Sequence, residues 1–143
     1  MKHYDGGEHG IGVFDYGEDF EIEKTNSGDR LFYTGNEPDG SKIRIPEGIK
    51  ECEGMFSRNE SLTTPPVIPS SVKACNYMFA YCKALKEAPE IPDGVLSCYG
   101  MFLGCESLTK KPKIPDSVWN TEEMFDECKN IASDEAEEDK DLE

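Results

Sequence analysis

Residues 45–131 decide the fold, because they repeat one pattern three times and begin it a fourth time. The chain reads IPEGIKECEGMFSRNESLTTPPV over residues 45–67, IPSSVKACNYMFAYCKALKEAPE over 68–90, IPDGVLSCYGMFLGCESLTKKPK over 91–113 and IPDSVWNTEEMFDECKNI over 114–131. Each unit opens on Ile-Pro, and 23 residues separate the successive isoleucines Ile45, Ile68, Ile91 and Ile114. A unit this short cannot bury its own apolar side, so we expect a solenoid whose stacked units share one core.

Each unit is predicted to contain a short helix followed by a short strand. In the second unit, apolar residues recur with the i, i+3, i+4, i+7, i+10 spacing of one helix face, at Cys75, Met78, Phe79, Cys82 and Leu85. The segment from Lys86 to Ile91 is short, and we expect it to be a strand that stacks on its counterparts at about 4.8 Å. The prolines at 66, 89 and 112 each remove a backbone donor, so this sheet should be narrow and irregular.

These residues resemble the BspA-type, or Treponema-type, leucine-rich repeats. That family has an Ile-Pro turn, an aromatic-containing pair, a cysteine three residues later and then a leucine, which match Ile68-Pro69, Met78-Phe79, Cys82 and Leu85. The pair is Met-Phe throughout, whereas the family often has Ala-Phe, and Asn59 replaces the cysteine of the first unit. The resemblance covers residues 43–131. It implies a right-handed coil that serves as a protein-binding scaffold, found in surface proteins and mobile genetic elements, without shared catalytic residues.

The predicted architecture is therefore an α/β repeat solenoid of about four units over residues 42–131, preceded by a β-type cap over residues 13–41. Within the cap, alternating apolar residues on either side of a turn at Thr25–Asp29 predict a hairpin that covers the first coil. A shift of 23 residues aligns Ile22 with Ile45 and Phe32-Tyr33 with Met55-Phe56, so a decayed repeat is the alternative interpretation.

The two ends of the chain carry most of its charge. The net charge is −15, with 10 acids and 3 bases in residues 1–40, 13 acids and 11 bases in residues 41–131, and 7 acids and 1 base in residues 132–143. A basic nucleic-acid-binding surface is thus not expected. We expect residues 1–12 to be flexible, because they are polar and rich in glycine, and residues 132–143 to be disordered, because they have almost no apolar content.

The location in the cell is predicted from what the sequence does not contain. No stretch approaches the roughly 20 apolar residues of a membrane span, and Met1–Gly12 has no apolar signal core. We expect a cytoplasmic protein without a membrane partner. If the chain is a fragment trimmed from a secreted parent, it would be surface-exposed instead.

Six cysteines fall in two columns of the repeat, Cys52, Cys75 and Cys98 in one and Cys82, Cys105 and Cys128 in the other. A disulfide framework would not lose single members to Thr121 and Asn59, so buried free thiols are favoured. Disulfides between neighbouring coils remain an alternative, because like cysteines should lie within roughly 4.4–6.8 Å between Cα atoms. Metal binding is another, although the intra-repeat spacing matches no ordinary zinc site.

Nothing in the chain resembles an active site, and no enzyme activity, cofactor or metal is expected. The only histidines, His3 and His9, lie in the N-terminal segment beside Asp5 and Glu8, where a solvated tail is the simpler interpretation than a weak metal site. No Cys-His or Ser-His pair and no phosphate-binding glycine motif occurs.

The candidate binding residues vary between units while their neighbours stay constant. In the predicted strands these variable rows are Thr63, Lys86 and Thr109; Thr64, Glu87 and Lys110; and Val67, Glu90 and Lys113. We expect them on one side of the stacked sheet, where they form either a binding ladder or merely a solvated surface.

A second candidate column follows the aliphatic core position and runs Lys50, Lys73, Leu96 and Trp119. Leu96 and Trp119, with Leu103, are predicted to form an exposed apolar patch, and tryptophan is favoured at binding hot spots. Alternatively, Trp119 packs into a C-terminal cap. Arg58 and Tyr81 share a further outward column.

The leading functional hypothesis is a non-catalytic scaffold that docks a partner protein through the exposed repeat face. One alternative is an acidic inhibitor that mimics nucleic acid, as phage-encoded anti-defence proteins do, because the charge is concentrated at the ends. Another is a fragment of a bacterial surface adhesin. Self-association through the open coil end near Ile131 is a further expectation.

Overall fold

The structure is a computed structural model that describes residues 3–6, 12–15, 19–25 and 28–131. Two antiparallel hairpins come first in the chain. Strand β1 (His3–Gly6) pairs with β2 (Gly12–Asp15), and β3 (Phe20–Thr25) pairs with β4 (Gly28–Tyr33). Residues 3–6, expected in a flexible segment, instead form β1. The predicted disorder of residues 132–143 lies outside the described residues.

The hairpin of β3 and β4 covers the first coil of the solenoid. Its register pairs Phe20 with Tyr33 and Ile22 with Leu31, and Phe20, Leu31 and Tyr33 are buried. The Tyr33 N–H donates to the carbonyl of Met55 at 2.9 Å, and the Tyr33 ring lies 5.2 Å from that of Phe56. The end of β4 therefore occupies the phenylalanine column, as the alternative of a decayed repeat anticipates, while Ile22 stays within the hairpin.

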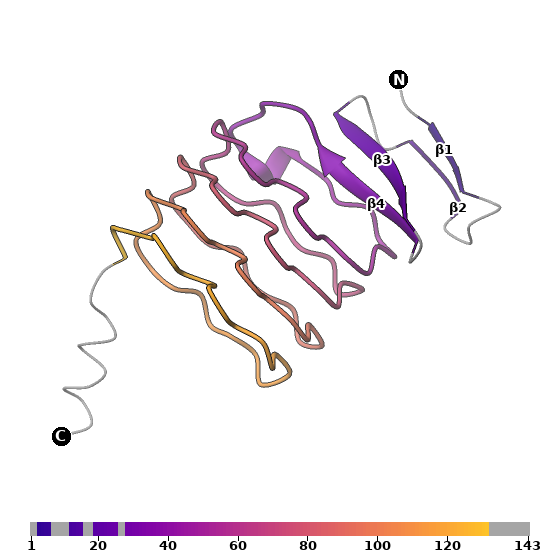
Figure 1. The fold of residues 1–143 in the computed structure, drawn as a ribbon. Coiled ribbons are helices and arrows are strands. Elements are labelled where there is room, and N and C mark those ends of the chain that lie inside the picture. The colour runs from indigo at the N-terminus through magenta and orange to yellow at the C-terminus, as the bar shows by residue number, and fades with distance from the viewer. Residues whose placement is uncertain (1–2, 7–11, 16–18, 26–27, 132–143) are drawn as a thin grey trace.

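Four coils are stacked behind the hairpin, which stands at one end of the stack, with residues 114–131 at the other (Figure 1). We call residues 45–67, 68–90, 91–113 and 114–131 coils 1 to 4. Parallel bridges join the coils through Glu51, Ala74, Ser97 and Asn120. A short 3-10 helix, η2 (Gly40–Lys42), connects the hairpin to coil 1, and Asp39 caps it by accepting from the Ser41 N–H at 3.0 Å.

One side of each coil is a row of tight turns, and we call residues 52–59, 75–82, 98–105 and 121–128 the turn face. In coil 2 the N–H groups of Met78, Ala80 and Cys82 donate three residues back, at 3.0–3.1 Å. The alternating N–H groups donate across to coil 3 at 2.6–2.9 Å, from Cys75, Tyr77, Phe79 and Tyr81 to Ser97, Tyr99, Met101 and Leu103. The predicted helix is therefore wrong, because half of its donors bond to the neighbouring coil.

Positive φ angles explain why no helix forms here. Two residues per coil, four positions apart, have φ between 57° and 74°, at Gly54 and Arg58, Tyr77 and Tyr81, Gly100 and Gly104, and Glu123 and Glu127. A right-handed helix requires negative φ throughout, whereas a type II turn requires positive φ at its third residue. The sequence signal that was missed is the glycine at 54, 100 and 104.

The opposite side of each coil, residues 63–69, 86–92 and 109–115, is the proline face. The strand predicted from Lys86 to Ile91 does not form. Between coils 1 and 4 the one backbone hydrogen bond across the described proline face runs from the Lys86 N–H to the Thr63 carbonyl, at 2.9 Å. Prolines have no N–H to donate, so this face has too few donors to form a sheet.

The core lies between these two faces and repeats with the coils. The rings of Phe56, Phe79 and Phe102 are fully buried and stack nearly parallel, with centroids 5.4 Å and 5.7 Å apart. Methionine, cysteine and leucine columns surround this ladder. The predicted core columns are therefore confirmed by their burial, although the backbone that presents them is not a helix.

Candidate partner-binding face

The proline face presents most of the predicted binding residues to solvent. Val67 is 80% exposed, and the exposed charged residues of this face are Lys86, Glu87, Glu90, Lys110 and Lys113. The rows alternate with buried positions such as Ile68 and Ile91, so the coil backbone holds their Cα atoms fixed while the side chains project outward. The exposed row residues change along the stack, from Val67 on coil 1 to Glu87 and Glu90 beside Lys86 on coil 2, and to Lys110 and Lys113 on coil 3.

Thr64 is the exception among these residues, because it is half-buried and bonded to the segment before coil 1. Its Oγ1 accepts from the Gly40 N–H at 3.1 Å and donates to the Asp39 carboxylate at 3.4 Å. Hydrogen bonds from Ser41 hold the pKa of Asp39 below its usual range, with a smaller effect from Thr64. Thr64 thus bonds η2 to coil 1, and its side chain is not free to bind a partner.

Five exposed charges of this face have no ion-pair partner. In the described part of the chain, none of Lys86, Glu87, Glu90, Lys110 and Lys113 takes part in an ion pair. Glu87 and Glu90 lie on coil 2, and Lys110 and Lys113 occupy the equivalent positions of coil 3. Their charges remain available to an external ligand.

Two shallow depressions lie between the coils of the proline face. One has a volume of about 380 Å³ and is lined by Pro65, Pro66, Val67, Ile68, Ser70, Pro89, Glu90 and Pro92. The other has a volume of about 410 Å³ and lies between coils 2 and 3, where Lys113, Pro112 and Pro115 face Ala88–Asp93. The candidate charges Glu90 and Lys113 therefore stand in the walls of concave surfaces.

The column of Lys50, Lys73, Leu96 and Trp119 forms a backbone ladder along one edge of the stack. Lys73 donates to the Lys50 carbonyl, Leu96 to that of Lys73 and Trp119 to that of Leu96, at 2.7–2.9 Å. Leu96 is 46% and Trp119 74% exposed. The alternative in which Trp119 packs into a cap is not found among the described residues. Leu103, in contrast, is half-buried and its carbonyl accepts from Tyr81 on the turn face.

Tyr81 has a structural role on the turn face. Its ring is half-buried, and the Arg58 guanidinium lies 4.7 Å from the ring centroid. On the other side, a Cβ added to Gly104 of the next coil would collide with the Tyr81 ring. Tyr81 is thus packed between coils 1 and 3, and its contacts leave it less available to a partner than the sequence pattern predicts.

The cysteine columns lie in the core. All six cysteines are free, and only Cys128 is partly exposed. The thiols of Cys82, Cys105 and Cys128 each donate to the phenylalanine carbonyl of the preceding coil at 3.0–3.1 Å. Asn59, in the same column, donates to the Gly35 carbonyl at 3.2 Å, so it replaces the thiol as a donor to the preceding segment.

Raised pKa values make Cys52, Cys75 and Cys82 poor nucleophiles. Burial raises the pKa of Cys52 and of Cys82 to about 12. The pKa of Cys75 is raised first by a hydrogen bond with the Cys98 thiol and then by burial. Because the thiolate is the reactive form, these residues are not candidates for nucleophilic catalysis.

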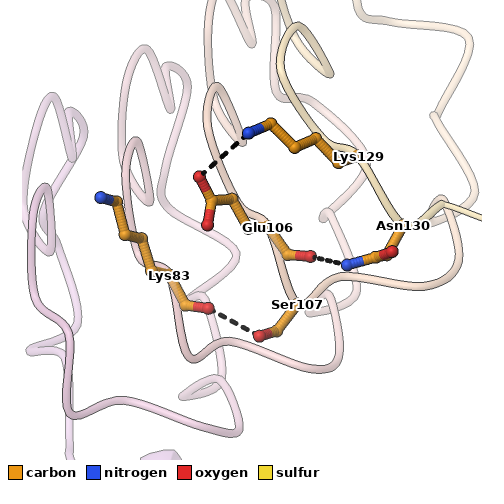
Figure 2. A network of polar contacts seen from close by, with 5 residues as sticks. All are labelled: Lys83, Glu106, Ser107, Lys129 and Asn130. Carbon is orange, nitrogen blue, oxygen red and sulfur yellow. Dashed lines mark hydrogen bonds and ion pairs between the residues drawn. The ribbon is translucent and has the colours of Figure 1, made fainter.

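Polar contacts tie coils 2, 3 and 4 together along the edge that follows the turn face (Figure 2). The Ser107 hydroxyl donates to the Lys83 carbonyl, and the Asn130 amide donates to the Glu106 carbonyl, both at 2.7 Å. Lys129 and Glu106 form an exposed ion pair at 3.8 Å. These contacts join one coil to the next and do not converge on a pocket, so the edge is structural.

The described residues include no group of three or more His, Cys, Asp or Glu side chains that could hold a metal ion. The weak metal site considered for His3, His9, Asp5 and Glu8 falls on side chains outside the described ones. No helix of the described chain has the length and apolar composition that crossing a membrane requires.

No protein-family model matches the sequence, and no curated protein is similar to it. Two solved structures have a similar fold. A leucine-rich cell surface protein from Faecalibacterium prausnitzii shares 22% identity with a TM-score of 0.54, over 82% of this chain and 38% of that one. The leucine-rich repeat protein of T. pallidum shares 21% identity with a TM-score of 0.52, over 80% of this chain and 67% of that one. Both neighbours are leucine-rich repeat proteins, in agreement with the BspA-type resemblance of the sequence.

Proposed function

With the leucine-rich-repeat fold as the premise, we propose that this chain is a non-catalytic scaffold that docks a partner protein through its proline face. The observation that carries the proposal is the set of five exposed charges on that face without ion-pair partners, held on a close-packed frame: Lys86, Glu87, Glu90, Lys110 and Lys113. Charged groups on a rigid concave surface select partners by electrostatic complementarity. The buried thiols and the absence of a catalytic pair in the sequence support a role without chemistry.

The apolar pair Leu96 and Trp119 supports an accessory contact at the neighbouring edge. Tryptophan is favoured at interface hot spots, and the exposed Leu96 extends the apolar surface beside Trp119. We place the main contact on the proline face, because two depressions and several exposed charges without ion-pair partners coincide there.

The experiment that tests this proposal is affinity capture from host-cell lysate with three versions of the chain as bait. These are the unchanged chain, the face variant Glu87→Lys/Lys110→Glu and the edge control Glu60→Lys/Lys83→Glu. Both variants exchange an acid and a base at exposed positions of coils 1 to 3 without changing the net charge. We expect the unchanged chain and the edge control to retain the same partner, and the face variant to bind it roughly tenfold more weakly.

Equal capture by all three baits would contradict docking through the proline face. Salt adds a second readout, since contacts between exposed charges weaken as ionic strength rises. A bait that ends at residue 131 tests the acidic-inhibitor alternative. A nucleic-acid enzyme that binds the unchanged chain, is released by salt and does not bind the truncated bait would favour the inhibitor. A partner that the truncated bait still binds would favour the scaffold.

The place where the scaffold works is a separate proposal. We propose a reducing compartment, in which the free cysteines would persist. The alternative is display on a cell surface, which is supported by the description of the F. prausnitzii neighbour as a cell surface protein. Fractionation of the source cells, followed by immunodetection, separates the two.

A further inference from the structure

The two depressions of the proline face belong to one continuous surface. They share Pro89, Glu90 and Pro92 of the proline-face segment 86–92 as a common wall, with segment 63–69 on one side and segment 109–115 on the other. At about 380 Å³ and 410 Å³, each is within the size range of ligand-binding clefts. A ligand that crosses the stack would therefore meet coils 1, 2 and 3 in turn.

The backbone of this surface has hydrogen-bonding capacity that the fold does not use. The N–H groups of Glu87, Ala88, Glu90 and Ile91 donate to no other group in the described part of the chain. Three of these residues, Ala88, Glu90 and Ile91, line the depression between coils 2 and 3. Extended peptides bind by such main-chain groups, while pockets for their side chains supply specificity.

The side chains along this surface impose an order on a ligand. Val67 on coil 1 is apolar and 80% exposed, and the first depression around it is lined mainly by prolines and Ile68. Coil 2 contributes Glu87 and Glu90 beside Lys86, and coil 3 contributes Lys110 and Lys113, all without ion-pair partners in the described chain. Of these charges, Glu90 and Lys113 line the depressions, so they set the order that a ligand meets. The complementary sequence of ligand groups is therefore apolar, then basic, then acidic.

Resting on the proposed function, we propose that this surface is a peptide-binding groove that takes an extended segment of the partner protein and selects side chains in the order apolar, basic, acidic from coil 1 to coil 3. A phosphate is not the complementary group at the centre of the groove, because Glu90 lines both depressions there. The acidic residues 132–143 fit poorly, since they carry a single base among seven acids.

The test is selection from a display library of random nine-residue peptides on three immobilised proteins. These are the unchanged chain, the charge-exchanged variant Glu87→Lys/Glu90→Lys/Lys110→Glu/Lys113→Glu and the edge control Glu60→Lys/Lys83→Glu. We expect the unchanged chain and the edge control to enrich apolar-basic-acidic peptides, in either chain direction. We expect the exchanged variant to enrich apolar-acidic-basic peptides.

Synthetic peptides of the two enriched patterns then give affinities in a crossed comparison. Each protein should bind the peptide of its own pattern roughly tenfold more tightly than the other peptide, as expected for two exposed charge pairs whose signs are reversed. Amide signals of the proline face, and not those of the turn face, should shift when peptide is added. The same enriched pattern from all three proteins, or signal shifts on the turn face, would overturn the groove.

Two further outcomes separate this inference from the proposed function. In the first outcome, no peptide is enriched, but the partner captured from lysate still binds the face variant more weakly than the edge control. The proposed scaffold function is then supported, and the peptide groove is overturned. If no peptide is enriched and the unchanged chain forms dimers that the charge exchange abolishes, the occupant is a second copy of the chain and the inference also fails.

Discussion

At the scale of single residues, the turn face is stabilised by side chains that cover the glycines of the next coil. The Tyr77 ring lies where a side chain at Gly100 would project, and a Cβ there would come within 2.6 Å of the ring. Gly100 also has φ of 59°, which an alanine adopts only with strain. Tyr77 itself has φ of 57°, so this contact offsets a conformational cost of the order of 1–2 kcal/mol.

Substitution of Gly100 by alanine tests this arrangement. We expect Gly100→Ala to lower the free energy of unfolding by about 2–3 kcal/mol, from backbone strain and the collision with Tyr77. The matched control is Gly48→Ala, since Gly48 has φ of 92° with nothing within 4 Å of its added Cβ, so only the strain applies. Urea unfolding of Gly100→Ala, Tyr77→Ala and the double variant Gly100→Ala/Tyr77→Ala measures the coupling between the two residues. Purely additive losses of stability would contradict the contact.

The buried thiols predict how stability depends on pH. Burial raises the pKa of Cys52 and Cys82 to about 12, whereas a thiol in the unfolded chain has a pKa of about 8.5. Above that lower value the unfolded state loses protons that the folded state keeps. The contribution of these thiols to stability should therefore be constant below about pH 8 and fall as pH rises from there toward 12, by up to about 1.4 kcal/mol per pH unit for each such thiol.

Urea unfolding at pH 7.5 and pH 9.5, under reducing conditions, measures this dependence. Replacement of Cys82 by alanine should cost about 1–2 kcal/mol at pH 7.5 but reduce the loss between the two pH values. A variant with the same pH dependence as the unchanged chain would show that this thiol does not titrate on unfolding.

At the scale of elements, the phenylalanine ladder joins one coil to the next. Phe79 stacks between Phe56 and Phe102 at 5.4 Å and 5.7 Å, with interplanar angles of 7° and 4°. Phe125 ends the ladder, has a stacked neighbour on one side in the described chain, and is only partly buried. The contribution of each ring should therefore depend on its place in the stack.

Truncation of two equivalent rings tests that dependence. We expect Phe79→Ala to cost about 3–5 kcal/mol, because it removes a fully buried ring and leaves a cavity between two coils. Phe125→Ala should cost roughly 1–2 kcal/mol, since its ring is half solvated and its site can collapse. The comparison requires urea midpoints with unchanged m-values. Equal losses of stability would mean that the contribution of a ring does not depend on its place in the stack.

At the scale of the whole molecule, the solenoid is asymmetric. Its turn face is joined by backbone hydrogen bonds from coil to coil, whereas its proline face is nearly free of them. Stability is thus concentrated on one side, and hydrogen-bonding capacity is left on the other, where the candidate binding residues lie. A scaffold with this distribution keeps its frame rigid while its binding face stays accessible.

Amide hydrogen exchange measures this asymmetry directly. We expect the amides of Cys75, Tyr77 and Phe79 to exchange at least roughly a thousandfold more slowly than those of Glu87 and Glu90, because only the former donate to a neighbouring coil. NMR-detected exchange on the unchanged chain resolves both sets. Similar protection on the two faces would contradict the open proline face.

The sequence by itself determined the period of the solenoid, the residues that fill its core and the rows that vary on its surface. Ile45 and its equivalents fix the repeat, and burial of the Met-Phe, cysteine and leucine columns follows from stacking units that cannot bury themselves. The exposure of Glu87, Glu90, Lys110 and Lys113 was predictable in the same way, since variable polar positions on a repeat face solvent.

Only the tertiary structure decided which backbone donors bond locally and which bond to another coil. The apolar spacing from Cys75 to Leu85 fits a helix and a row of turns equally well, because both bury the same side chains. Positive φ at Tyr77 is stabilised by a glycine 23 residues later, and Thr64 leaves the binding ladder because Asp39 and Gly40 bond to it. Such contacts join residues that are distant in the chain, so no local pattern encodes them.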